Sequence, residues 1–251
     1  MTIQYCSDLH LEIPDNEHYL KNNPLVPSGE VLILAGDIVP FSIMDRHSWF
    51  FDRLAQQYEA VYWLPGNHEY YDSHIEDRSG AFKEAIRPNV WLINNACAQH
   101  GPVTLACSTL WTSISPVAEQ AIAHGMADYR NIKRRGERLR PLHTYRMHKT
   151  SRRFIEDAVK QTGKNLVIAT HHVPTFMHHP EEYRHSPLNE AFASELSPFI
   201  ENSGARAWIY GHHHRNTPAF HIGQTAMLNN QLGYVKLNEH HTFNPSMTLT
   251  L

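Results

Sequence analysis

Short apolar runs that end in glycine or in polar side chains recur along this chain of 251 residues. They cover Val31–Ala35, Ala60–Leu64, Leu166–Thr170 and Ala207–Tyr210. A run this short, without regular polar alternation, predicts a strand that is buried on both faces, as in the middle of an α/β sandwich. Residues 2–7 alternate weakly and predict a further strand at the start of the chain.

Between these runs, apolar residues recur at helical spacing. The predicted helices cover residues 45–58, 75–86, 144–161 and 189–202, and shorter strands are predicted at 90–93, Val103–Ser108, 219–222 and Thr225–Asn229. We expect Asp45 to cap the first helix and Gly163 to follow the third. Residues 14–29 carry three prolines and predict a loop, whereas residues 115–143 show no firm pattern. The alternation predicts an α/β fold whose last two strands complete a second sheet.

Side chains that can bind metal ions follow five of the predicted strands. They are Asp8 and His10, Asp37, Asn67 and His68, His171, and His212 and His214. Open α/β sheets place ligands at the carboxyl ends of strands, so we expect these side chains to lie together. A buried acid such as Asp37 is costly unless it is paired, and we expect two metal ions to pair with it. Each motif alone has a simpler interpretation, as a turn or as surface histidines.

Residues two apart in extended backbone face the same way. We therefore expect Asp8 and His10 to point together, and His212 and His214 to do the same, while His213 points away.

The amino-acid composition is consistent with a metal site and with a protein outside membranes. The chain has 20 histidines against 22 Lys and Arg, and histidine is the commonest metal ligand in proteins. Cys6, Cys97 and Cys107 form no paired motif, which indicates free thiols in a reducing compartment. No apolar stretch approaches the roughly 20 residues that span a bilayer, and Asp8 lies too near the start to follow a cleaved presequence. We expect a cytoplasmic protein without membrane contact, with residues 1–251 forming a single domain.

The order of the motifs resembles that of the calcineurin-like metallophosphoesterase superfamily. The family pattern is DxH, GD, GNH[ED], His and GHxH, and here it is Asp8-Leu9-His10, Gly36-Asp37, Gly66-Asn67-His68-Glu69, His171 and Gly211-His212-His213-His214. The segments TLWTS at 109–113 and Asp128-Tyr129-Arg130 are also similar to an uncharacterised bacterial branch of phosphohydrolases.

The resemblance implies a four-layer α-β-β-α sandwich with two mixed β-sheets and a two-metal centre. One ion would be held by Asp8, His10, Asp37 and His214, and the other by Asp37, Asn67, His171 and His212, with Asp37 bridging. A nitrogen and oxygen ligand set without thiolate favours Mn, Fe or Zn as divalent or trivalent ions. Two divalent ions would exceed the charge of Asp8 and Asp37, which suits a bridging hydroxide and an anionic phosphate. The implied function is hydrolysis of a phosphate monoester or diester by that hydroxide.

His68 is not needed to complete this ligand count. We therefore predict that His68 faces the substrate, where it protonates the leaving oxygen or stabilises charge on the phosphoryl group.

At two positions the chain differs from the motifs of known branches of this superfamily. The protein Ser/Thr phosphatases carry an acid and Arg-Gly shortly after GD, where this chain has Ile38-Val39-Pro40-Phe41. The cyclic-nucleotide phosphodiesterases usually have Asp or Asn at the position of Pro40. Neither branch is favoured. Two other functions stay open: a non-catalytic binding module on the same fold, and a metallohydrolase that acts on an unphosphorylated bond.

A basic segment at residues 130–153 holds ten of the 22 positive residues and one acid, Glu137. It is either a solvated surface or part of a basic flap around residues 115–150 that steers a polyanion toward the metal ions. The expected partner is a small phosphorylated substrate, with a nucleotide or other polyanion as one form of it.

Residues 171–185 hold five histidines, which apart from His171 we expect at the rim of the site, with a substrate contact for His172 as an alternative. The oligomeric state is left open.

Overall fold

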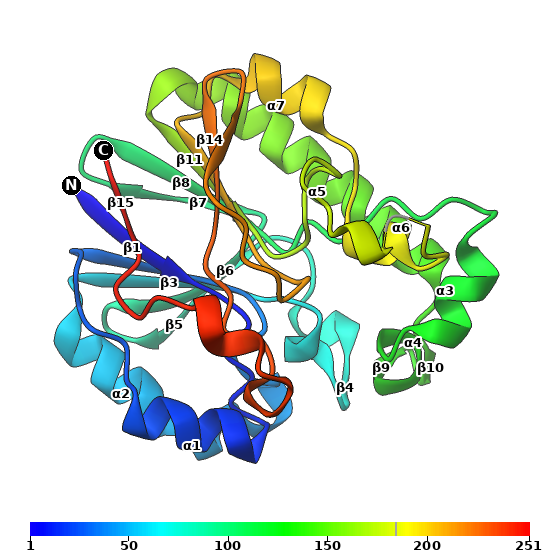
Figure 1. Cartoon of the computed structure of the whole chain (residues 1–251), viewed down its shortest axis with the longest axis horizontal. Helices are drawn as coiled ribbons and strands as arrows, with labels where there is room; N and C mark the ends of the chain where they lie inside the picture. Colours follow the sequence, from blue (N-terminus) through cyan, green and yellow to red (C-terminus); the bar gives the residue numbers. More distant parts are fainter. Residues whose placement is uncertain (184) are drawn as a thin grey trace.

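The computed structural model describes residues 1–183 and 185–251. Two mixed six-stranded sheets pack face to face, and helices cover the outer face of each sheet (Figure 1). This is the four-layer α-β-β-α arrangement expected above, and the fold class is confirmed.

The first sheet has the strand order β15-β1-β2-β3-β6-β5. Its strands are β1 (Thr2–Cys6), β2 (Val31–Ala35), β3 (Ala60–Leu64), β5 (Phe82–Arg87), β6 (Val90–Asn94) and β15 (Thr248–Thr250). The four central strands are parallel, and β15 and β5 are antiparallel edge strands. The carboxyl ends of the central strands therefore lie at one edge of this sheet.

The second sheet repeats this plan in the order β13-β14-β12-β11-β8-β7. Its strands are β7 (Ala96–His100), β8 (Val103–Ser108), β11 (Leu166–Thr170), β12 (Ala207–Tyr210), β13 (Phe220–Ile222) and β14 (Thr225–Asn229). Again the four central strands are parallel, and the edge strands β13 and β7 are antiparallel. The prediction that 219–222 and 225–229 complete a second sheet is confirmed.

The helices are distributed between the two sheets. They are α1 (Pro14–Asn22), α2 (Ser48–Gln57), α3 (Glu119–Gly125), α4 (Asp128–Asn131), α5 (Pro141–Thr162), α6 (Asn189–Phe192) and α7 (Ser197–Ser203). Figure 1 shows α1 and α2 outside the first sheet and α5 and α7 outside the second. The short helices α3, α4 and α6 lie beyond the strand ends.

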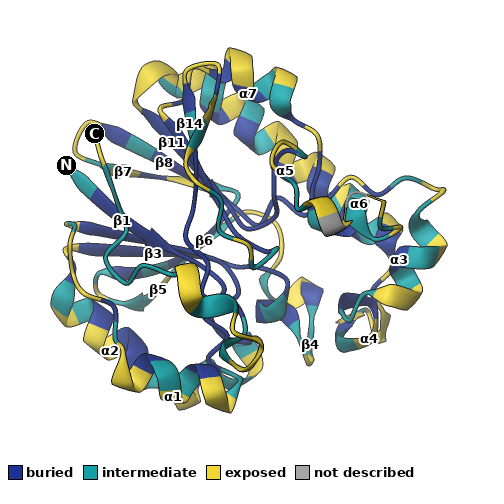
Figure 2. Cartoon of the chain, viewed as in Figure 1, coloured by how far each residue is buried: buried dark blue, intermediate teal, exposed yellow. Residues whose placement is uncertain are grey.

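Strand β2 shows why the apolar runs lack alternation. Val31, Ile33 and Ala35 pack in the core between the two sheets. Leu32 and Leu34 pack on the other face, against the helices of the first sheet. Both faces of β2 are covered, so every position is apolar, and Figure 2 shows the middle strands of the sheets as mostly buried.

Two expected elements are wrong because of local backbone chemistry. Residues 14–22 form α1 rather than a loop, since Pro14 stands at the start of the helix, where its missing N–H costs nothing. Residues 75–86 do not form one helix: a 3-10 turn at Ile75–Arg78 precedes strand β5. Gly80 at φ +79° separates the two, and β5 pairs with β6.

Two other helices differ in their limits. Helix α2 begins at Ser48 after a 3-10 segment, so Asp45 is not its cap. Residues 189–202 are split into α6 and α7, because Val173 pairs with Ala193 in the break. Gly163 follows α5, as expected.

Residues 115–143, which had no firm pattern, contain α3, α4 and two short strands. Strands β9 (Ile132–Arg134) and β10 (Glu137–Arg138) form a three-stranded sheet with β4 (Ser73–His74). Ile122, Tyr129 and Ile132 belong to a separate apolar cluster beneath these elements. In the described residues, no helix has both the length and the apolar character needed to cross a bilayer.

Candidate metal centre

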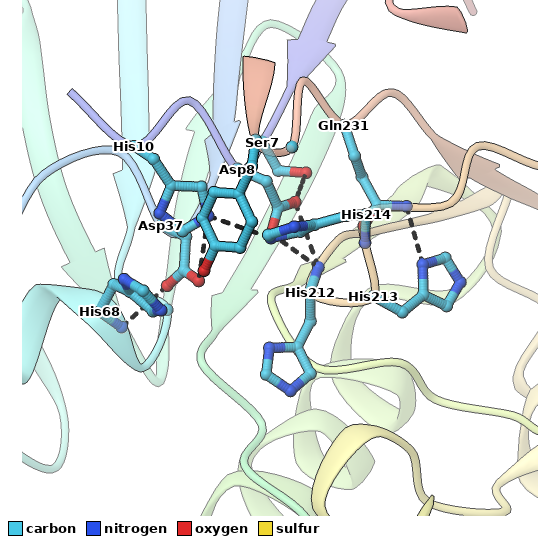
Figure 3. A network of polar contacts seen from close by, with 12 residues as sticks. Ser7, Asp8, His10, Asp37, His68, His212, His213, His214 and Gln231 are labelled. Atoms are coloured by element: carbon cyan, nitrogen blue, oxygen red, sulfur yellow. Dashed lines mark hydrogen bonds and ion pairs between the residues drawn. The ribbon is translucent and has the colours of Figure 1, made fainter. Parts of the chain in front are cut away.

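The predicted ligands gather where strands from the two sheets end. Backbone pairing continues past the strand ends, since His10 N–H donates to the carbonyl of Asp37 (3.0 Å) and Gly211 N–H donates to that of His171 (2.9 Å). The amide of His212 also donates to the carboxylate of Asp8 (3.1 Å), which links the two sheets at the site. Figure 3 shows the side chains of Asp8, His10, Asp37 and His214 close together.

At five of the seven predicted ligands the backbone is left-handed rather than extended. The φ angles are +57° at Asp8, +48° at His10, +55° at Asp37, +83° at His212 and +54° at His214. Asp8 and His10 converge at the site, and so do His212 and His214, as predicted. They do so through tight turns, so the prediction of extended backbone at these residues was wrong. Such angles are rare for residues with side chains, and they persist where the surrounding structure enforces them.

Gly36 shows how closely the loops approach. Its φ is +89°, and a Cβ at this position would collide with Nδ1 of His171. Only glycine permits both the angle and the contact.

The first ligand group contains Asp8, His10, Asp37 and His214, whose ligand atoms lie within 4.8 Å of one another. Nε2 of His10 lies 3.0 Å from Nε2 of His214. Nε2 of His214 is 3.4 Å from Oδ1 of Asp8, and Nε2 of His10 is 3.8 Å from Oδ2 of Asp37. This is the set that the resemblance assigns to one ion.

The second group contains Asp37, His171 and His212. Nε2 of His171 lies 3.4 Å from Oδ2 of Asp37 and 3.1 Å from Nδ1 of His212. Oδ1 of Asn67 lies 3.1 Å from the same nitrogen of His171. Asp37 belongs to both groups, and its Oδ2 faces Nε2 of both His10 and His171, as suits a bridging ligand.

Each candidate ligand imidazole is held by its other ring nitrogen. Nδ1 of His10 pairs with Glu12 (3.0 Å) and Nδ1 of His214 pairs with Glu239 (2.8 Å). Nδ1 of His171 donates to the carbonyl of Ala35 (3.0 Å), and Nε2 of His212 donates to that of Ala191 (3.3 Å). Metal-binding histidines characteristically have such outer partners, which direct the free nitrogen toward the ion.

Four carboxylates at the centre were not predicted from the sequence. Besides Glu12 and Glu239, they are Glu69 and Asp128. Asp128 accepts a hydrogen bond from Nδ2 of Asn67 (2.9 Å), which directs Oδ1 of that amide toward His171. The charge count from Asp8 and Asp37 alone was therefore incomplete. Two of them had a sequence signal: Glu69 follows Asn67-His68 in the motif, and Asp128 begins the Asp128-Tyr129-Arg130 segment that is similar to the bacterial branch.

Glu69 connects the loops after β2 and β3. Its carboxylate accepts hydrogen bonds from the backbone N–H groups of Asp37 (2.9 Å), Ile38 (2.7 Å) and Gly66 (2.6 Å), and from Nε1 of Trp63 (3.0 Å). Burial and the nearby Asp37 raise the pKa of Glu69 to about 7, and the backbone donors oppose that rise. One buried side chain thus sets the relative position of both loops.

The electrostatics of the centre favour charged oxygen ligands. Burial opposes ionisation of Asp37, but the charges of His171 and His68 lower its pKa well below the ordinary value. Burial lowers the pKa of His214, yet its hydrogen bonds to Asp8 and Glu239 raise that pKa to about 10. Burial raises the pKa of Glu12, but the neighbouring His10 and His68 lower it to about 2.

His68 lies beside the ligand groups without belonging to either. Its Nδ1 is 3.0 Å from Oε1 of Glu12, and its ring stacks on that of Tyr71 with a centroid distance of 4.1 Å. Burial lowers the pKa of His68, but Asp37 and Glu12 raise it to about 9. The side chain lines the cavity described below.

The remaining histidines fall into different environments. His172 is buried rather than at a rim, and its ring packs 4.2 Å from that of His212 while Nδ1 donates to the carbonyl of Thr109. Burial and the charge of His171 lower the pKa of His172 to about 3. His213 contacts Gln231 instead of the ligand groups, as predicted (Figure 3). His179 lines the cavity, whereas His178 packs on Phe220.

A cavity of about 410 Å³ opens beside the two groups. Its floor includes Asp37, Asn67, His68, His212 and His214. Its outer wall includes the apolar and aromatic side chains of Tyr71, Met126, Ala127, Leu188, Phe192 and Tyr234, and also the more polar residues His179, Tyr183, Ser186, Asn189, His213 and Glu239.

The donor set fits a pair of transition-metal ions. It combines imidazole nitrogens, carboxylates and one amide oxygen, contains no thiolate, and divides into two groups that share one carboxylate. The outer hydrogen bonds of all four imidazoles leave one nitrogen of each for the ions.

The calcineurin-like phosphoesterase family model matches residues 1–216. The chain belongs to this family. It is also 31% identical to an uncharacterized protein of Acanthamoeba polyphaga mimivirus, over 97% of this chain and 94% of that one. The structure resembles the phosphopantetheinyl hydrolase of Mycobacterium tuberculosis, with a TM-score of 0.72 and 17% identity over 99% of this chain and 95% of the other. Family membership and the candidate metal site together support a metal-dependent phosphoesterase.

Proposed function

We propose that the protein hydrolyses a phosphate monoester or diester with two metal ions held by the two ligand groups. The observation that carries the proposal is the position of Asp37, which belongs to both groups. When bound, such ions activate water at neutral pH and stabilise the attacking and leaving oxygens of an in-line displacement.

The residues around the ions have separate tasks in this proposal. Asp8, His10, Asp37 and His214 hold one ion, and Asp37, Asn67, His171 and His212 hold the other. Glu12 and Glu239 fix the rings of His10 and His214, and Glu69 fixes the loop that carries Asp37.

His68 is the proposed general acid for the leaving oxygen. Glu12 holds its Nδ1, and no hydrogen bond among the described residues engages its Nε2. The imidazole is therefore oriented toward the cavity, where a leaving group must sit.

The proposal is tested with stripped protein that is reloaded with Mn, Fe or Zn separately. The panel contains phosphate monoesters, phosphodiesters, a nucleotide and 4′-phosphopantetheine, the last because of the structural resemblance to a phosphopantetheinyl hydrolase. We expect metal-dependent release of phosphate or alcohol from one ester class, with two ions per chain.

Two other outcomes would replace the proposal. Two bound ions without turnover of any ester would indicate the non-catalytic binding module. Turnover confined to unphosphorylated esters or amides would indicate a different metallohydrolase.

A further inference from the structure

The cavity beside the metal centre has a wall built from two segments outside the sheets. Met126 and Ala127 lie between α3 and α4, and Leu188 and Phe192 lie at the two ends of α6. Figure 1 shows these helices close together beyond the strand ends. Met126 and Ala127 belong to the insert or flap expected around residues 115–150, whereas Leu188 and Phe192 lie at the helix predicted over residues 189–202.

This wall is packed rather than loose. A Cβ on Gly125 would lie 2.7 Å from Cδ2 of Leu188, so the end of α3 packs closely against the Leu188 side chain. Ala191 between Leu188 and Phe192 is buried in the same apolar cluster as Ile122. Side chains supported in this way present a fixed apolar surface to the cavity.

The apolar wall reaches the metal centre itself. The ring of Phe192 packs on that of His212 with a centroid distance of 5.0 Å, and the ring of Tyr71 stacks on that of His68. A group attached to a phosphate at the ions would therefore meet aromatic and aliphatic side chains from its first atoms onward.

The positive charges of the basic segment lie elsewhere. Among the described residues that line this cavity, none is Lys or Arg. Arg146 lines a different hollow with Trp111, and Arg153 lines another with Cys97. A second phosphate or a carboxylate on the substrate would be desolvated along the apolar wall without a described Lys or Arg side chain beside it, which is unfavourable.

We propose that this cavity binds an uncharged, apolar group of the substrate, so that the substrates are phosphate esters of alkyl or aryl alcohols. The proposal rests on the proposed phosphoesterase function, because that function places the phosphate at the ions. It deepens that function by naming the substrate class.

The binding test uses non-hydrolysable phosphonates with the metal-loaded protein. Phenylphosphonate should bind about tenfold more tightly than methylphosphonate in calorimetry, which corresponds to burial of roughly two methylene groups. Leu188→Asn and Met126→Gln should each reduce this ratio toward one while the metal content stays at two ions. Leu142→Asn changes an exposed leucine that does not line the cavity, and should keep the ratio.

The kinetic test compares two alkyl leaving groups of similar chemistry. n-Butyl phosphate should have a higher kcat/KM than glycerol 1-phosphate, and the advantage should shrink in the two wall variants. Added salt should affect n-butyl phosphate and a nucleoside monophosphate equally, since no steering by the basic segment is involved.

The contrary results separate the two proposals. Equal binding of the phosphonates, or a preferred nucleotide whose kcat/KM falls more steeply with salt, would overturn the apolar cavity and leave the phosphoesterase standing. A phenyl preference in binding without hydrolysis of any ester would support the cavity and refute the proposed function. Failure of both phosphonates to bind would overturn both.

Discussion

The two six-stranded sheets follow one plan but supply different chemistry to the centre. The loops of the first sheet contribute the oxygen ligands Asp8, Asp37 and Asn67 with a single imidazole, His10. The loops of the second contribute only imidazoles. Each ligand group nevertheless draws from both sheets, so neither sheet alone can hold an ion.

Direct hydrogen bonds cross the same boundary. Nδ1 of His171, from the second sheet, donates to Ala35 of the first, and the backbone of His212 donates to Asp8. The comparison shows that the centre is also a junction between two similar halves. Its chemistry and the packing of the sheets are therefore coupled.

Asp37→Asn should have the largest effect. It removes the charge shared by both groups, so both ions should be lost and turnover should fall by more than the roughly 10²–10⁴-fold expected for loss of a general acid. Elemental analysis and kcat/KM measure the result, with Asp45→Asn, at an exposed carboxylate, as the matched control. Retention of two ions and near-normal turnover would show that Asp37 does not bridge.

His68→Ala tests the proposed general acid, an imidazole on a loop of the first sheet that is assigned as a ligand to neither ion. It should keep both ions and lose about 10²–10⁴ in kcat/KM on alkyl phosphates, but far less on nitrophenyl esters, whose leaving group hardly needs a proton. His221→Ala, at an exposed position on β13, is the control.

A uniform loss across leaving groups would instead favour charge stabilisation by His68. Loss of an ion in the variant would mean that His68 is a ligand.

Glu239→Gln should lower the metal affinity of only one ligand group, the one that contains His214. Its carboxylate holds only His214 among the candidate ligands, so affinity for one ion should fall about 10–100-fold while the other ion stays bound. A metal titration followed by calorimetry resolves the two sites, and Glu201→Gln at an exposed position should leave both unchanged. Equal weakening of both ions would show that the groups are not separable.

Chelation should give the smallest effect, a lower melting temperature with the fold intact. An ion at about 100 times its Kd stabilises by about 2.7 kcal/mol, which corresponds to roughly 5–10 °C for a chain of this size. Calorimetry with and without chelator measures the shift, and Asp37→Asn should show none. An unchanged melting temperature of the parent protein would refute the idea that the ions tie the sheets together.

The sequence by itself determined the central strands and the candidate ligands. A strand buried on both faces must be apolar throughout, so Val31–Ala35 and its counterparts were visible as runs. The ligand candidates were visible because polar side chains directly after such runs are unusual, and because their order resembles a family pattern. The structure places all of them in one cluster.

Only the tertiary structure decided what surrounds these residues. Glu12, Asp128 and Glu239 come from separate segments, and no local spacing marks them as partners of His10, Asn67 and His214. The apolar wall at Met126 and Leu188 was equally hidden, because these residues are distant in the sequence and come together only in the folded chain. Local patterns report how a segment is buried, whereas contacts between distant segments depend on how whole elements pack.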